Sequence, residues 1–145
     1  MRKKGSFYEH EEERNSDLME VYKKCLASMT YVSMARLWEL MAEYPAKRFY
    51  VSEERAAIVV SRIFHGDNLS NMRPTRRKMF YEIHSRVQKI IQDKPQLSIA
   101  QCCSMIVYSP APSFFMTPFS IRQTVYKIKR QWYEQRRNRT YHLAL

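Results

Sequence analysis

Two groups of residues in the second half of the sequence carry side chains suited to binding phosphates and nucleobases. The first group is the basic cluster Arg73, Arg76, Arg77 and Lys78. The second group follows Pro118 and comprises Ser120, Arg122, Gln123, Thr124, Lys127, Lys129, Arg130, Arg136 and Arg137, with Arg139 beyond it. Arginine and glutamine form paired hydrogen bonds with guanine and adenine edges, whereas lysine and hydroxyl groups contact phosphate oxygens. These residue types favour recognition of a nucleic acid over the making or breaking of bonds.

The sequence contains no arrangement typical of a catalytic or metal centre. The histidines at 10, 65, 84 and 142 are scattered and lack a carboxylate or cysteine at metal-ligand spacing. No Ser/His/Asp or Cys/His arrangement, glycine-rich phosphate loop or paired-carboxylate motif is present. The acidic run from Glu9 to Glu13 is interpreted as a solvated helix face. We therefore expect a protein that is not an enzyme and uses no cofactor.

The net charge of +11 is concentrated in one half of the chain. Residues 1–63 carry 11 Lys/Arg and 10 Asp/Glu, a net +1, whereas residues 64–145 carry 14 and 4, a net +10. Such an asymmetric basic field is typical of a nucleic-acid surface, although an anionic membrane or an acidic protein would also be attracted. The second half is therefore the predicted binding half.

The composition favours a soluble all-helical fold. The chain is 45% hydrophobic and 13% aromatic, and its two glycines, Gly5 and Gly66, leave little provision for tight turns. No apolar run approaches a membrane span, and the basic N-terminus is followed by acidic residues rather than by an apolar signal core. We expect a cytoplasmic protein without membrane contact, whose three cysteines are reduced, mostly buried thiols.

The second half of the sequence also repeats the first without a gap. When residues 17–63 are laid over 82–128, eight positions are identical, among them Ser33/Ser98, Pro45/Pro110 and Phe49/Phe114. Most other apolar positions stay apolar. The repeat predicts a tandem pair of three-helix units, residues 1–63 and 64–145, that pack together because each is small alone.

Each unit shows the same helix punctuation. A first helix carries apolar residues at spacings of three and four and, in the second unit, runs from Pro74 to Lys94. A second helix starts at Ser33 or Ser98 and ends before a proline, and an extended connector then places Phe49 or Phe114 in the core. A third helix starts at Ser52 or Thr117. In the second unit it runs to about residue 137, with an inward stripe of Ile121, Val125, Ile128 and Trp132. Trp38 is likewise predicted to pack rather than stack on bases.

The order of parts resembles a helix-turn-helix DNA-binding domain. Residues 98–107 followed by 117–130 resemble that superfamily, and Thr124-Val-Tyr-Lys-Ile-Lys129 is similar to the close of the recognition helix in resolvase-type domains. The resemblance implies that the helix over 118–130 enters the major groove. Its connector, residues 110–117, is longer than the usual turn, so the resemblance does not set the angle between the helices.

The first unit differs where the second is basic. Its third helix opens with Glu53 and Glu54, and carboxylates repel phosphate. We expect residues 1–63 to pack, form a homodimer or recruit a protein partner, while residues 64–145 bind DNA in preference to RNA. The predicted function is a small transcriptional regulator or mobile-element accessory factor. The alternatives are an RNA-binding or ribonucleoprotein component and a structural protein that docks an acidic partner.

Overall fold

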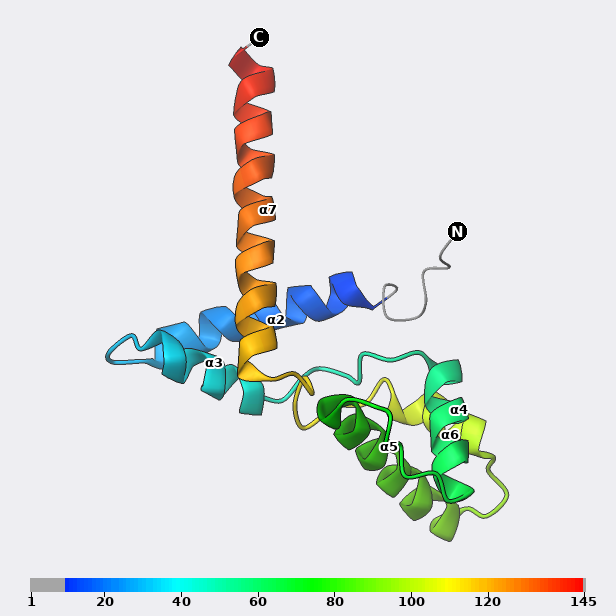
Figure 1. Ribbon diagram of the computed structural model, residues 1–145. Coiled ribbons are helices and arrows are strands. Elements are labelled where there is room, and N and C mark those ends of the chain that lie inside the picture. Colours follow the sequence, from blue (N-terminus) through cyan, green and yellow to red (C-terminus); the bar gives the residue numbers. More distant parts are fainter. Residues whose placement is uncertain (1–9, 145) are drawn as a thin grey trace.

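A computed structural model describes residues 10–144, with side chains to residue 139 (Figure 1). Its helices are α2 (Glu11–Ser28), α3 (Met34–Glu43), α4 (Glu53–Phe64), α5 (Pro74–Asp93), α6 (Ile99–Ile106) and α7 (Pro118–Ala144). These residues contain no β-strand, and the all-α prediction is confirmed. Within the same range, no helix combines the length and the apolar character that a membrane crossing requires.

The four predicted hydroxyl caps are confirmed. Ser33, Ser52, Ser98 and Thr117 each accept a hydrogen bond from the backbone N–H three residues further on. Ser98 and Gln101 form a reciprocal capping box, in which the Gln101 side chain accepts from the Ser98 backbone N–H. Because these caps hold the first turns, α3 and α6 start at matching positions of the repeat, and so do α4 and α7.

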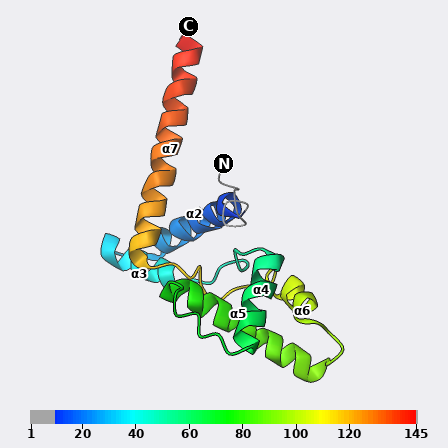
Figure 2. The same cartoon turned by 45° about the vertical axis from the view of Figure 1, so that its right-hand side comes forward.

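The helices pack in two bundles whose membership differs from their order in the chain. One bundle contains α2, α3 and α7, and the other contains α4, α5 and α6 (Figures 1 and 2). The third helix of each predicted unit therefore packs on the first two helices of the other unit. Residues 98–130 likewise divide between the bundles, since α6 packs on α4 and α5 while α7 packs on α3 and α2.

The two connectors cross between the bundles and pair at their centre. Ala46 and Ala111, which occupy matching positions of the repeat, exchange both backbone N–H···O hydrogen bonds at 3.0 Å in an isolated antiparallel bridge. Two stacked ring pairs flank the bridge: Phe49 with Phe115 at 5.9 Å and Tyr50 with Phe114 at 6.1 Å. Phe49 and Phe114 are only 1% and 6% exposed, which confirms their predicted place in the core.

Buried polar residues fasten the first connector to α2. The carboxylate of Asp17, which is buried on α2, accepts hydrogen bonds from the Lys47 backbone N–H at 2.9 Å and from the Tyr50 hydroxyl at 2.5 Å. Arg48 is 8% exposed, and its guanidinium donates to the backbone carbonyls of Phe49 and Val51 and pairs with Glu13 at 3.5 Å. The connector is therefore held against the core, since Asp17 and Arg48 are buried with hydrogen bonds to its backbone.

The apolar core agrees with the predicted helix faces apart from one residue. Ile121, Val125 and Ile128 of α7 are buried, and Cys25, Cys102 and Cys103 are buried free thiols as predicted. The predicted inward position of Trp132 is wrong, because this side chain is 44% exposed. Past Ile128, α7 projects beyond α2 and α3, and residues 130–139 are exposed (Figure 1). The predicted helix end near residue 137 is also wrong, since α7 continues to Ala144.

Candidate nucleic-acid interface

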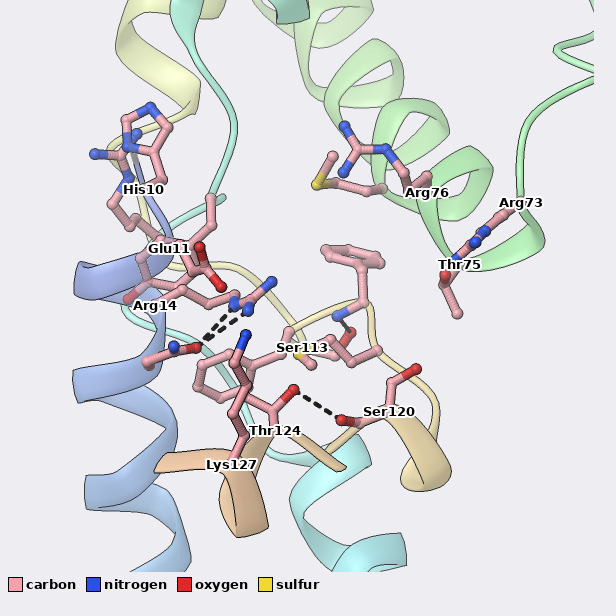
Figure 3. A pocket seen from close by; sticks show the side chains of 17 residues that line it. His10, Glu11, Arg14, Arg73, Thr75, Arg76, Ser113, Ser120, Thr124 and Lys127 are labelled. Atoms are coloured by element: carbon pink, nitrogen blue, oxygen red, sulfur yellow. Dashed lines mark hydrogen bonds between the residues drawn. The ribbon is translucent and has the colours of Figure 1, made fainter. Parts of the chain in front are cut away.

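A pocket of about 320 Å³ lies where the two bundles meet (Figure 3). Its walls come from the start of α2, the start of α5, the second connector and the first half of α7. Its charged and imidazole side chains are His10, Glu11, Arg14, Arg48, Arg73, Arg76 and Lys127. The pocket therefore combines five cationic groups with a single carboxylate, and this excess of positive charge suits an anion.

The pocket brings together residues from both predicted basic groups. Arg73 and Arg76 enter from the start of α5, while Ser120, Thr124 and Lys127 enter from α7. Figure 3 shows Lys127 reaching from α7 toward Arg14 on α2, with Arg76 extending from the opposite wall. Thr124 donates its hydroxyl to the Ser120 carbonyl at 2.8 Å, which holds its side chain along the helix.

Three of the pocket cations have no counter-charge among the described residues. Across residues 10–139, the side chains of Arg73, Arg76 and Lys127 form no hydrogen bond or ion pair, although Arg76 lies over the Phe80 ring at 5.6 Å. Burial lowers the pKa of Arg76, and the like charges of Arg55 and Arg14 lower it further. Burial also lowers the pKa of Arg14, while Glu11 acts in the opposite direction. Partly desolvated like charges of this kind would be stabilised by a bound anion.

Sequence reasoning missed Arg14 and Arg48 at this pocket. Both come from the first half of the chain, whose near-neutral charge gives no sign of a basic site. Arg14, which follows Glu11–Glu13, donates to the Asn15 side chain at 3.1 Å. Arg48 lies over the Tyr108 ring at 4.4 Å in addition to its backbone hydrogen bonds. No local motif marks either residue, because their approach to Arg76 depends on how the two bundles meet.

The pocket wall also contains an unusual backbone conformation. Phe115 has φ +54°, in the left-handed region that bulky residues rarely occupy. Its backbone N–H donates to the Ser113 hydroxyl at 3.0 Å, and its ring stacks on Phe49. Both Ser113 and Phe115 line the pocket. Conformations of this kind cost of order 1–3 kcal/mol and cluster at functional sites.

A second basic surface runs along α7 on another face of the helix. Five exposed residues at spacings of four, four, three and four form what we call the arginine–tyrosine stripe: Arg122, Tyr126, Arg130, Tyr133 and Arg137. At 100° per residue these positions fall within about 80° of one another around the axis. The Arg122 guanidinium lies 5.5 Å from the centre of the Tyr126 ring. The stripe contains no carboxylate, and it extends from the bundle onto the projecting end of the helix.

The remaining predicted site residues are distributed around these two surfaces. Lys129 is turned into the bundle, where its amine donates to the Tyr22 hydroxyl and lies 4.5 Å from the centre of that ring. Gln123 is exposed beside the stripe, and Arg136 and Arg139 are exposed on the projecting part of α7. Arg77 is half-buried and Lys78 exposed on α5, outside the pocket lining. The predicted residues thus lie mainly on two separate surfaces, the pocket and the stripe, and Arg77, Lys78 and Lys129 belong to neither.

Among the described residues, no group of His, Cys, Asp and Glu is arranged to hold a metal ion. The arrangement provides cations, hydroxyls and aromatic rings, which bind phosphates and bases by charge, hydrogen bonding and stacking.

A scan against protein-family profiles and searches of curated proteins and of solved structures found nothing that matches this chain.

Proposed function

We propose that this protein binds duplex DNA and that α7 is the helix that reads it. The observation that carries this proposal is the arginine–tyrosine stripe on a helix that projects from its bundle. The major groove of B-form DNA admits an α-helix, whereas the major groove of A-form RNA is too deep and narrow for side chains to read. A projecting basic helix therefore suits DNA better than duplex RNA.

The two ends of α7 contribute differently to the proposed interaction. The first half is held rigidly, because Ile121, Val125 and Ile128 are buried against the bundle. Arg122 and Gln123 on this half would contact base edges, since both can form paired hydrogen bonds. Arg130, Arg136, Arg137 and Arg139 on the projecting half would contact the phosphates on either side of the groove.

We also propose that the fold is a tandem repeat in which the third helices have been exchanged. The matching helix starts, the Ala46–Ala111 bridge and the crossed ring pairs support this interpretation. On this view the first unit has a further role beyond the predicted partner contacts. It supplies α2 and α3, the platform that orients α7. The biological role that fits is a small regulator of transcription or an accessory factor of a mobile element.

Fluorescence anisotropy with labelled duplex DNA at several salt concentrations tests the proposal. Arg122→Glu and Arg130→Glu should each weaken binding strongly, because a carboxylate in the stripe repels phosphate. Lys94→Glu is the matched control, since Lys94 is exposed at the end of α5 in the other bundle. Equal affinities for the wild type and both stripe variants would overturn the assignment of α7.

Competition against nucleic acids of equal length and charge separates the remaining functions. We expect unlabelled duplex DNA to displace the probe at lower concentration than duplex RNA. Stronger displacement by RNA would instead support the RNA-binding alternative. If no binding is seen at moderate salt with either polymer, the basic surface serves a protein partner.

A further inference from the structure

We propose that the pocket between the bundles binds a terminal phosphate group, the phosphomonoester carried by a free nucleotide or by the end of a nucleic-acid strand. This site is separate from the arginine–tyrosine stripe. The pocket residues of α7 lie outside the stripe's arc: at 100° per residue Lys127 is the nearest, about 60° from Arg130 around the axis, and Ser120 and Thr124 lie farther away. The proposal therefore does not require α7 to bind a duplex.

The charge of the pocket matches a dianion. Arg48 donates to backbone carbonyls and pairs with Glu13, and Arg14 donates to Asn15. Arg73, Arg76 and Lys127 are the pocket cations whose side chains form no hydrogen bond or ion pair among residues 10–139. A phosphomonoester carries a charge of about −1.5 to −2 at neutral pH, whereas a phosphate within a strand carries only one negative charge. Guanidinium groups also suit phosphate because their planar fork donates two hydrogen bonds at once. Of the two phosphate types, the terminal one balances this cluster better.

The shape of the pocket favours the end of a molecule over the middle of a polymer. Its volume of about 320 Å³ is near the lower limit of pockets that hold small ligands. Three helices and both connectors line it, so a phosphate at a free end reaches it more easily than a phosphate within a polymer. A stiff duplex presents its internal phosphates only on an outer surface. A nucleotide or a single-strand end can instead insert its phosphate between α2, α5 and α7 (Figure 3).

The aromatic side chains in the pocket wall would contact the base or ribose of the ligand. Tyr50, Phe114 and Phe115 line the pocket beside the cations. Phe115 has a left-handed backbone conformation there. Tyr50, which occupies the corresponding position of the first connector, does not have a positive φ. Stacking on an aromatic ring is available to every base, and strained residues concentrate where a ligand is clamped. The strain at Phe115 therefore lies where a base or ribose would be held.

Calorimetry and thermal shift on the full chain test the pocket directly. The probes are adenosine monophosphate, adenosine, inorganic phosphate, and one short single-stranded oligonucleotide with either a 5′-phosphate or a 5′-hydroxyl end. We expect adenosine monophosphate to bind and raise the melting temperature, and adenosine to do neither. If the strand end is the natural source, the phosphorylated oligonucleotide should bind about tenfold tighter than its hydroxyl form, the effect of charge-assisted hydrogen bonds. Binding of the mononucleotide without such an end preference assigns the site to free nucleotides.

Variants identify the cations responsible. Arg76→Gln should abolish the response to adenosine monophosphate, and Lys94→Gln, an exposed position in the same bundle, should leave it unchanged. If Arg76→Gln fails to fold, Lys127→Gln serves instead, because Lys127 is exposed and makes no side-chain hydrogen bond among residues 10–139.

Two results would overturn the proposal: equal binding of adenosine and adenosine monophosphate, or no response to any phosphate-bearing probe. Duplex binding that depends on Arg122 and Arg130 would survive either result. Conversely, loss of duplex binding would leave the mononucleotide response standing.

Discussion

Helices α4 and α7 occupy corresponding places in the two bundles, yet they end differently. Each starts after a hydroxyl cap, and each packs on the first two helices of the other half of the chain. α4 stops at Phe64, where Gly66 turns the chain with φ +94°. Near this end Arg62 is neutralised by Asp67 at 2.7 Å, whereas Lys127, the counterpart of Arg62 in the repeat, enters the pocket unpaired among the described residues.

The buried faces of the two helices serve packing, whereas the exposed face of α7 carries the proposed function. The buried faces of α4 and α7 follow one pattern, since Ala56, Val60, Ile121 and Val125 are all fully buried. The exposed faces have diverged, because α4 opens with Glu53 and Glu54 whereas α7 carries the arginine–tyrosine stripe. Packing constrains only the inner face, so the outer face is free to acquire a ligand on one helix and to lose it on the other.

The largest expected effect is on stability, and it compares the two buried phenylalanines of the connectors, Phe49 and Phe114. Phe49→Ala should lower the free energy of unfolding by about 3–5 kcal/mol, because it empties a fully enclosed site. Phe114→Ala should cost less, since that ring is slightly more exposed. Urea denaturation followed by circular dichroism measures both. Equal losses of stability, or a larger loss for Phe114→Ala, would show that ring burial does not determine which connector contributes more to stability.

The next effect concerns the stripe alone. Replacing Arg122, Arg130 and Arg137 together by alanine should reduce the slope of log K against log salt by about 2, because the phosphates contacted by Arg130 and Arg137 would no longer be neutralised by the protein. The loss of Arg122 should weaken binding further through its base contacts. The melting temperature should hardly change, because all three side chains are exposed. Replacing Arg55 and Arg62 of α4 by alanine provides the control. A similar decrease of slope in that control would remove the distinction between the two helices.

A smaller effect concerns position 50, where the first connector has tyrosine and the second has Phe115. The pKa of Tyr50 is raised by burial and by its hydrogen bond to Asp17. A group whose folded pKa is raised adds stability below its unfolded pKa, which is about 10 for tyrosine, and that stability is lost as pH rises further. The free energy of unfolding should therefore fall above pH 10.

Tyr50→Phe should remove the part of this alkaline decline that Tyr50 causes. It should also cost about 1.5–3 kcal/mol at neutral pH, because the carboxylate of Asp17 loses a donor. Denaturation curves at pH 7, 9 and 11 test both statements. An unchanged alkaline decline in the variant would assign the titration to another group.

The smallest effect is expected at the turn after α4. Asp67→Asn breaks an ion pair between two partly exposed side chains. Such pairs contribute little, so stability and binding of adenosine monophosphate should both stay within experimental error of the wild type. Lys127→Asn, made for comparison, should lose the nucleotide response. A clear gain of nucleotide binding in Asp67→Asn would mean that Arg62 also takes part in anion binding.

Short-range chemistry made the helices of this chain predictable. The caps at Ser33, Ser52, Ser98 and Thr117 act over three residues, and the inward faces follow from helical periodicity. The periodicity predicts Trp132 inside, but this residue is 44% exposed, with the Lys23 amine of α2 at 6.0 Å from the centre of its ring, because α7 there leaves the bundle. Sequence spacing reports which face would be buried, but it does not report where the covering helices stop.

The packing of α4 on α5 and α6, and of α7 on α2 and α3, was beyond prediction for a different reason. Because residues 17–63 and 82–128 share their apolar pattern, the sequence does not distinguish packing of α4 on α5 and α6 from packing of α4 on α2 and α3, and the same holds for α7. Sequence similarity between the copies therefore leaves the pairing undecided. The pocket depends on that pairing, so Arg73 and Lys127 were identified as separate sites while Arg14 was overlooked.

The two halves of the chain cross at Ala46 and Ala111, and each half places its third helix in the bundle of the other half. A protease cut in the turn around Gly66 would yield two fragments, each with helices in both bundles. Pulling these fragments apart would require both bundles to open together, since neither fragment can leave while its third helix stays packed. Mechanical strength in this molecule therefore resides in how its halves interlock, and an intact backbone at residue 66 is not required for it.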